Sequence, residues 1–145
     1  METNNFFSHG QLSIGNIDID EDHYRLLEII NDLNNLIQFE KDRKEFARIL
    51  SLMTDYSLTH FKLEELYMKE FNYPKLDAHK KSHFKYIYIV SNYNVALLGI
   101  NPPDPREIVD FLKNWWENHI LKMDSSYENY RKEIKSVATY RKTSI

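Results

Sequence analysis

Six histidines are the residues of this sequence best suited to chemistry, and five of them share a pattern. Each of the five occurs where apolar side chains repeat every three or four residues, which predicts the buried face of a helix: His23, His60, His79, His83 and His119. A single buried histidine usually only forms hydrogen bonds within the core. Five imidazoles in one small core leave many polar atoms to satisfy, and a bound metal satisfies them together. The set therefore predicts a metal centre.

Two carboxylates accompany these histidines. Glu64 follows His60 by four residues, so both side chains project from one face of a helix. Asp124 follows His119 by five residues, a spacing that turns Asp124 off the histidine line of an α-helix. From there Asp124 could still reach a second metal, one turn further along the bundle.

The number and type of these ligands favour two metals. One metal takes about four to six ligands, whereas two metals bridged by Glu64 and Asp124 use all seven side chains. Such nitrogen-rich ligands suit iron, zinc, copper or nickel, and bridging carboxylates are typical of di-iron or di-manganese bundles. The chain has His-x-x-x-Glu and His-x-x-x-His in place of the Glu-x-x-His pairs of ferritin-like sites. Neutral ligands disfavour the high-valent iron that oxidises substrates and favour reversible ligand binding.

Composition removes several other classes of function. The absence of cysteine excludes a disulfide scaffold, a thiolate nucleophile, an iron–sulfur cluster and a cysteine zinc site. The net charge of −3 gives no electrostatic reason to expect nucleic acid or an anionic membrane as partner. No apolar run is long enough to span a membrane, and the N-terminus does not resemble a signal peptide. We therefore expect a cytoplasmic protein.

Long helices must position the ligands, because only 3 Gly and 4 Pro interrupt 145 residues. That length fits one domain covering residues 1–145. We predict an N-terminal arm over residues 1–19 and four helices, at about 20–39, 42–71, 75–98 and 105–135. The short connections favour an all-α, up-down-up-down antiparallel four-helix bundle over a looser all-α fold.

Local signals set the predicted helix ends. Asp20 and Asp104 are candidate N-caps of the first and fourth helices, and Pro105 suits a first helical residue. Pro74 ends the second helix, because a proline disfavours helix at the residue before it. Gly99 is a plausible stop for the third helix.

The ordered set of motifs resembles the hemerythrin family, and within it the single-domain bacterial members. The resemblance runs from about Leu12 to Tyr130 and rests on an ordered series of segments: Ile19 to His23, His60 to Glu65 with Met68, Tyr73-Pro74, His79 to His83, Trp115, His119-Ile120 and Asp124. It implies two iron ions joined by an oxo or hydroxo bridge. One iron, six-coordinate, would be held by His79, His83 and His119. The other would keep an open position for dioxygen beside His23 and His60. Both irons would be bridged by Glu64 and Asp124.

The sequence departs from this family at two places. Trp116 stands where the family usually has a leucine beside the oxygen pocket. Its larger ring could narrow the pocket or point into a helix interface, and both interpretations stay open at this stage. Phe6 and Phe7 stand where the N-terminal arm usually carries a tryptophan. Candidate pocket-lining residues are Phe61, Trp115 and Trp116.

The resemblance implies reversible dioxygen binding, for oxygen storage, delivery or protection, rather than enzymatic turnover. The alternatives are a di-iron peroxidase, a nitric-oxide-handling enzyme, or a sensor of oxygen, iron or redox state. We expect dioxygen as the partner molecule, and a monomer or weak homo-oligomer. Glu65, next to a predicted ligand, is expected to face solvent, and His9 to lie on the surface.

Overall fold

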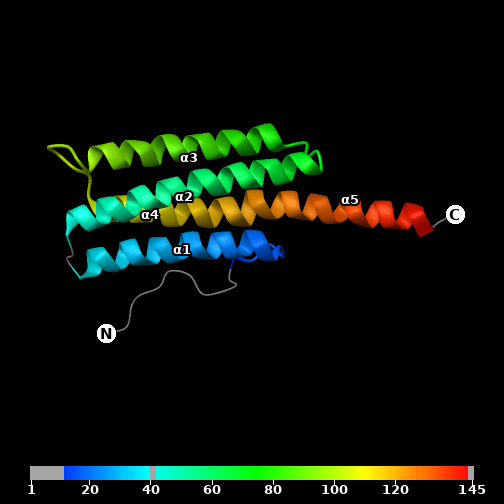
Figure 1. The fold of residues 1–145 in the computed structure, drawn as a ribbon, viewed down its shortest axis with the longest axis horizontal. Coiled ribbons are helices and arrows are strands. Elements are labelled where there is room, and N and C mark those ends of the chain that lie inside the picture. Colours follow the sequence, from blue (N-terminus) through cyan, green and yellow to red (C-terminus); the bar gives the residue numbers. More distant parts are fainter. Residues whose placement is uncertain (1–11, 40–41, 144–145) are drawn as a thin grey trace.

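The computed structural model consists of four helical rods lying side by side, with alternating chain direction (Figure 1). It describes residues 12–39 and 42–143, so the predictions for Phe6, Phe7 and His9 lie outside the described residues. Three rods are single helices: α1 (Ile17–Gln38), α2 (Arg43–Glu70) and α3 (Leu76–Ala96). The fourth is continuous and has three parts: α4 (Pro105–Asn118), the π-helix η1 (His119–Asp124) and α5 (Ser125–Thr143). The described residues contain no strand, and the predicted up-down-up-down bundle is confirmed.

The first helix begins earlier than the sequence predicted. Its N-cap is Asn16, whose side-chain oxygen accepts the Ile19 N–H at 3.2 Å. Asp20 is therefore not the cap. Its carboxylate accepts hydrogen bonds from the Ile14 N–H at 2.8 Å and the Ser13 hydroxyl at 2.6 Å. Asp20 thus ties the segment before α1 to the helix.

Side chains cap two of the other rods. The Asp42 carboxylate accepts the Lys44 N–H at the start of α2, and Asp104 accepts the Arg106 N–H at the start of α4. The latter matches the predicted cap. Between α2 and α3, Asn72 adopts a positive φ of 52°, a left-handed conformation that asparagine tolerates better than most residues. These ends leave short connections, which hold neighbouring rods antiparallel.

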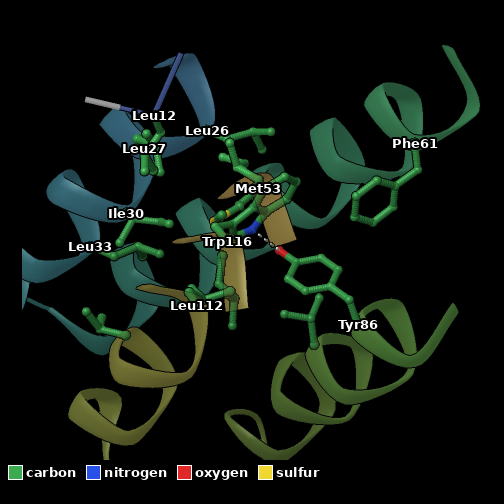
Figure 2. Packing of buried hydrophobic residues seen from close by; sticks show 14 of the residues in the cluster. Leu12, Leu26, Leu27, Ile30, Leu33, Met53, Phe61, Tyr86, Leu112 and Trp116 are labelled. Atoms are coloured by element: carbon green, nitrogen blue, oxygen red, sulfur yellow. Dashed lines mark hydrogen bonds between the residues drawn. The ribbon is translucent and has the colours of Figure 1, made fainter. Parts of the chain in front are cut away.

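Most of the apolar core lies in one half of the bundle, and the predicted ligands lie in the other half together with a few buried apolar residues such as Met68, Tyr73 and Tyr127. The apolar half contains the C-terminal part of α1, the N-terminal part of α2, and the adjoining parts of α3 and α4. Its fully buried residues include Ile30, Leu33, Leu50, Val90, Ile108 and Leu112. Figure 2 shows several of them packed around Met53 and Trp116. None of the described helices has both the length and the apolar character needed to cross a membrane.

Candidate metal centre

All seven predicted ligands are buried, and all four rods contribute to them. The seven are each at most 4% exposed: His23, His60, Glu64, His79, His83, His119 and Asp124. Their ligand atoms form two groups, each with all its members within 4.8 Å of one another. The larger group is Glu64, His79, His83, His119 and Asp124. The smaller group is His23, His60 and Glu64.

In the larger group three imidazoles point their Nε2 atoms at one place. The Nε2 atom of His119 lies 3.1 Å from that of His79 and 3.1 Å from that of His83. His79 and His83 are one turn apart on α3, and His119 comes from the fourth rod. Three nitrogen lone pairs that meet at one point form half of an octahedral metal site.

Glu64 joins the two groups, because each of its oxygens faces a different one. Its Oε1 atom lies 3.0 Å from the Nε2 atoms of both His79 and His83. Its Oε2 atom lies 3.2 Å from the Nε2 of His60 and 3.7 Å from that of His23. One carboxylate can therefore serve both groups.

Asp124 repeats this arrangement from the fourth rod. Its Oδ1 atom lies 3.0 Å from the Nε2 of His79 and 3.1 Å from that of His119. Its Oδ2 atom lies 3.0 Å from the Nε2 of His23. The two carboxylates thus come from opposite rods, and each has one oxygen near the larger group and one near the smaller group.

The π-helix η1 explains how Asp124 reaches this position. A π-helix closes its hydrogen bonds from residue i to i+5, so residues five apart come into line. His119 and Asp124 are the first and last residues of η1, and their side chains meet at 3.1 Å. The expectation that Asp124 is turned off the histidine line is therefore wrong, because it assumed an α-helix. Backbone irregularities of this kind are frequent at functional sites.

A second layer of polar side chains orients the imidazoles. The His60 Nδ1–H donates to Asp22 Oδ2 at 3.1 Å, and the His83 Nδ1–H donates to Glu65 Oε2 at 2.8 Å. The Nδ1 of His119 lies 3.2 Å from the Ser82 hydroxyl. A proton held on Nδ1 leaves the Nε2 lone pair free to bind a metal. The sequence predicted that Glu65 faces solvent, but its carboxylate instead holds the imidazole of His83.

Sequence reasoning missed most of this second layer. Asp22 and Glu65 stand beside the ligands His23 and Glu64 in the sequence, but each contacts a histidine on a neighbouring helix. Tyr127, which donates its hydroxyl to Glu64 Oε2 at 3.1 Å, was also missed. It lies three residues after Asp124, a spacing that places the two on one helix face and could have indicated it.

In the metal-free protein, opposite charges attract the imidazoles and the carboxylates to one another. Burial alone would lower the pKa of His60, but its interactions with the carboxylates of Asp22 and Glu64 outweigh burial and raise that pKa to about 10. His79 behaves alike: burial opposes protonation, yet the nearby carboxylates raise its pKa to about 9. Burial would raise the pKa of the Glu64 carboxyl, but the surrounding histidines hold it well below its usual value. A positive charge is therefore stabilised among these histidines by the neighbouring carboxylates.

The polar atoms left without partners point to a metal rather than to a hydrogen-bonded core. Both oxygens of Asp124 and the Nε2 atoms of His23 and His60 are buried and form no well-aligned hydrogen bond, although a group of opposite charge lies 3.0–3.2 Å from each. A buried polar atom without a well-aligned hydrogen bond is costly. Metal ions coordinated by these atoms would satisfy all of them. The residues present thus fit a metal cluster.

Aromatic rings enclose the centre on its apolar side. The Phe61 ring stacks on His83, with centroids 3.9 Å apart, and on Trp116 at 5.5 Å. Trp115 stacks on His119 at 4.3 Å. Trp116 is fully buried, with its ring 6.3 Å from His23 and 6.0 Å from His60. The Trp116 ring therefore borders the proposed centre and also packs against Tyr86 on α3, and its role in narrowing an oxygen pocket stays a prediction.

Hydrogen bonds hold the Trp116 ring in this position. Its Nε1–H donates to the Tyr86 hydroxyl at 3.1 Å, a contact shown as a dashed line in Figure 2. The Tyr86 hydroxyl lies 3.2 Å from that of Ser57, which donates to the Met53 carbonyl at 2.7 Å. A buried indole N–H without a partner would be costly. This chain of contacts satisfies it.

The fold and the site together define a helical bundle whose buried histidine and carboxylate side chains are suited to holding metal. Comparison with known proteins identifies the family. The sequence profile of the hemerythrin family, described as the hemerythrin HHE cation binding domain, matches residues 16–130. The chain belongs to this family.

Several individual proteins are similar to the chain. It is 36% identical over 110 residues to a bacteriohemerythrin of Pseudomonas aeruginosa, covering 75% of this chain and 70% of the relative. A bacteriohemerythrin of Clostridium acetobutylicum is 29% identical over 121 residues, which cover 81% and 94% of the two chains. The crystal structure of a wild-type hemerythrin aligns with a TM-score of 0.77 and 24% identity, over 85% and 94% of the two chains. This last similarity supports the fold.

Proposed function

We propose that this protein binds dioxygen reversibly at a pair of iron ions held without haem. The proposal rests on the two bridging candidates, because each carboxylate has one oxygen near each of the two histidine groups. Glu64 and Asp124 each direct one oxygen toward His79 in the larger histidine group and the other toward His23 in the smaller one. A buried carboxylate that faces two sets of imidazoles in this way is suited to bridging two metals. Membership of the hemerythrin family supports iron as the metal.

A count of ligands supports an open position at one metal. His79, His83 and His119 with two carboxylate oxygens give five ligands, and a bridging oxo or hydroxo group completes six. His23 and His60 with the remaining carboxylate oxygens give four, and the same bridge makes five. An ion held by these residues would have one place free if it took six ligands. The bound iron pair would supply that place and the electrons that make dioxygen binding favourable and reversible.

The residues of the chain protect this open side. Trp116 and Phe61 border the ring of His60 with apolar surface, at centroid distances of 6.0 Å each. Both rings are buried, so they limit the entry of water. Exclusion of water and of protons from outside prevents side reactions of a bound ligand. This environment supports a carrier, because a reversibly bound ligand must be kept from water and protons.

The test is an absorption spectrum of the purified protein, with iron measured in the same sample. The protein is reduced without oxygen, exposed to air and then deoxygenated. We expect two irons per chain and charge-transfer bands that appear in air and vanish on deoxygenation. Immediate irreversible oxidation, or catalytic reduction of peroxide or nitric oxide, would overturn the proposal in favour of an enzyme or sensor. The role in storage, delivery or protection, the cytoplasmic location and a monomeric or weakly oligomeric state stay predictions.

A further inference from the structure

An apolar groove of about 530 Å³ runs along the outside of the bundle between α2 and α3. Its apolar surface comes from Leu58 and Phe61 on α2 and from Phe84 and Ile87 on α3. Phe84 is 72% exposed, a large fraction for an aromatic ring. Tyr88, one turn further along α3, is 63% exposed. Exposed apolar side chains gathered in this way often mark a site of protein interaction.

Lysines surround this groove. Four of the residues that line it carry a positive charge and are exposed: Lys62, Lys80, Lys81 and Lys85. The acidic residue lining it is Glu65, whose carboxylate is engaged by the His83 Nδ1–H at 2.8 Å. The whole chain has a net charge of −3, so this concentration of positive charge is local. It would attract a negatively charged surface.

The floor of the groove touches the metal centre. Phe61 lines the groove, and its ring is stacked on that of His83 at 3.9 Å with 11° between the planes. Glu65 lines the groove and is hydrogen-bonded to the other side of His83. The predicted iron ligand His83 itself lines the groove beside these two side chains, so a molecule seated there lies next to the centre.

We propose that this groove is the docking site of an acidic one-electron carrier protein that restores the iron pair to its ferrous state. The proposal rests on the proposed function, because a ferrous pair that oxidises needs a reductant before it can bind dioxygen again. Each carrier molecule gives up one electron and is itself oxidised. Two encounters therefore return two ferric ions to two ferrous ions.

The shape and exposure of the groove favour a protein over a small anionic amphiphile. A small ligand normally loses most of its surface into a pocket, with about 70–90% buried. Here Phe84 and Leu58 stand out from the surface, at 72% and 40% exposure, and do not close over a cavity. An apolar centre with a charged rim is the usual anatomy of a protein interface. Charge at the rim acts mainly on the rate of encounter, which suits a transient electron donor.

The test uses a reduced plant-type [2Fe–2S] ferredoxin as the acidic carrier and the ferric protein as acceptor. Stopped-flow absorption gives the second-order rate constant of reduction. We expect the double variant Lys80→Glu/Lys85→Glu to lower this constant about tenfold or more at low ionic strength, because it reverses two charges at the rim. The difference should shrink in about 0.3 M salt, where the Debye length is shorter than 10 Å. Phe84→Ala should also slow the reaction, at either ionic strength.

A matched control carries the same change of charge away from the groove. Lys44→Glu/Lys135→Glu alters two exposed lysines, at the start of α2 and in α5. This control should reduce the rate much less than the groove variant does. Reduction by dithionite, a small anion whose charge is screened in about 0.3 M salt, should be equal in all variants under that condition. Equal slowing by both double variants, or slowing by neither, would overturn the proposed docking site.

A binding measurement separates this proposal from the proposed function. Isothermal titration calorimetry of the protein as purified with oxidised ferredoxin at low salt measures docking without any turnover. Weaker binding by Lys80→Glu/Lys85→Glu than by the control supports the groove even if dioxygen binding proves irreversible. Unchanged binding overturns the docking site, even if the spectrum shows a reversible carrier. A small anionic amphiphile such as laurate that bound the groove and left ferredoxin affinity unchanged would also overturn it.

Discussion

The residues of the centre divide into those shared by both proposed metal positions and those that would serve one. Glu64 lies between the two groups, with an oxygen 3.0 Å from His79 and another 3.2 Å from His60. His23 belongs to the smaller group, and its Nε2 lies 3.0 Å from Asp124 Oδ2. This division makes the effects of single substitutions distinguishable.

Replacement of the shared carboxylate should remove both irons. In Glu64→Gln the amide keeps the size of the side chain but loses the charge, so we expect little iron to remain. In His23→Ala only one position loses a ligand, and about half of the iron should remain. Iron per chain, measured by mass spectrometry of the folded variants, checks both. Equal iron in the two variants would contradict the assignment of Glu64 as the bridge.

The indole of Trp116 should govern how long dioxygen stays bound. Trp116→Leu opens space beside His23 and His60, which admits water, so we expect faster irreversible oxidation with unchanged iron content. The substitution leaves a cavity and should destabilise the fold by on the order of 2–4 kcal/mol. Trp115→Leu, beside the other metal position, is the matched control. Decay of the oxygenated spectrum in air measures the effect, and identical decay in wild type and Trp116→Leu would contradict it.

Helices bring these residues together, and most of their arrangement could be predicted from sequence. The three- and four-residue repeats identified all four rods, because they report directly which helix face is buried. Asp22 and Glu65 could not be paired with His60 and His83 in this way. Their contacts depend on how far one helix is shifted along its neighbour, and a repeat within a single helix contains no information about that shift. The start of α1 was missed because Asn16 and Asp20 are both good caps.

At the scale of the element, the π-helix η1 leads to a testable prediction. It accommodates one residue more than an α-helix of the same length would, so deletion of one residue should let the rod become α-helical throughout. Leu121 is suited to this, because it lies within η1 and is 50% exposed. We expect its deletion to keep the helix content, seen by circular dichroism, and to retain iron, because His119 and Asp124 then stand four residues apart on one face of an α-helix. Leu121→Ala should also retain iron, and iron lost only after the deletion would show that η1 does more than align these two residues.

At the scale of the molecule, the centre connects all four rods, so its charge affects the stability of the whole bundle. In the metal-free protein the pKa values of His60 and His79 are raised to about 10 and about 9, from a usual value near 6.5. A raised pKa in the folded state stabilises it fully below the unfolded value and loses this effect as pH rises through the folded value.

Metal-free protein should therefore become less stable between about pH 6.5 and 10. Iron-loaded protein should not show this loss, because its imidazoles are neutral ligands throughout. Iron should also raise the melting temperature at every pH in this range, since metal binding adds to the folding free energy. Melting curves of the two forms, recorded by circular dichroism, test this. Parallel pH profiles for both forms would contradict the pairing of histidines with carboxylates.

The two neighbouring tryptophans give the protein a built-in optical readout. The sequence contains 2 Trp, and both lie beside the proposed centre: Trp115 is stacked on His119, and Trp116 lies 6.3 Å from His23 and 6.4 Å from His119. Iron close to an indole quenches its fluorescence. In Trp115→Phe or Trp116→Phe the emission of the single remaining indole would report iron anywhere in the centre. Emission recorded during iron addition would then show how many irons each chain takes up.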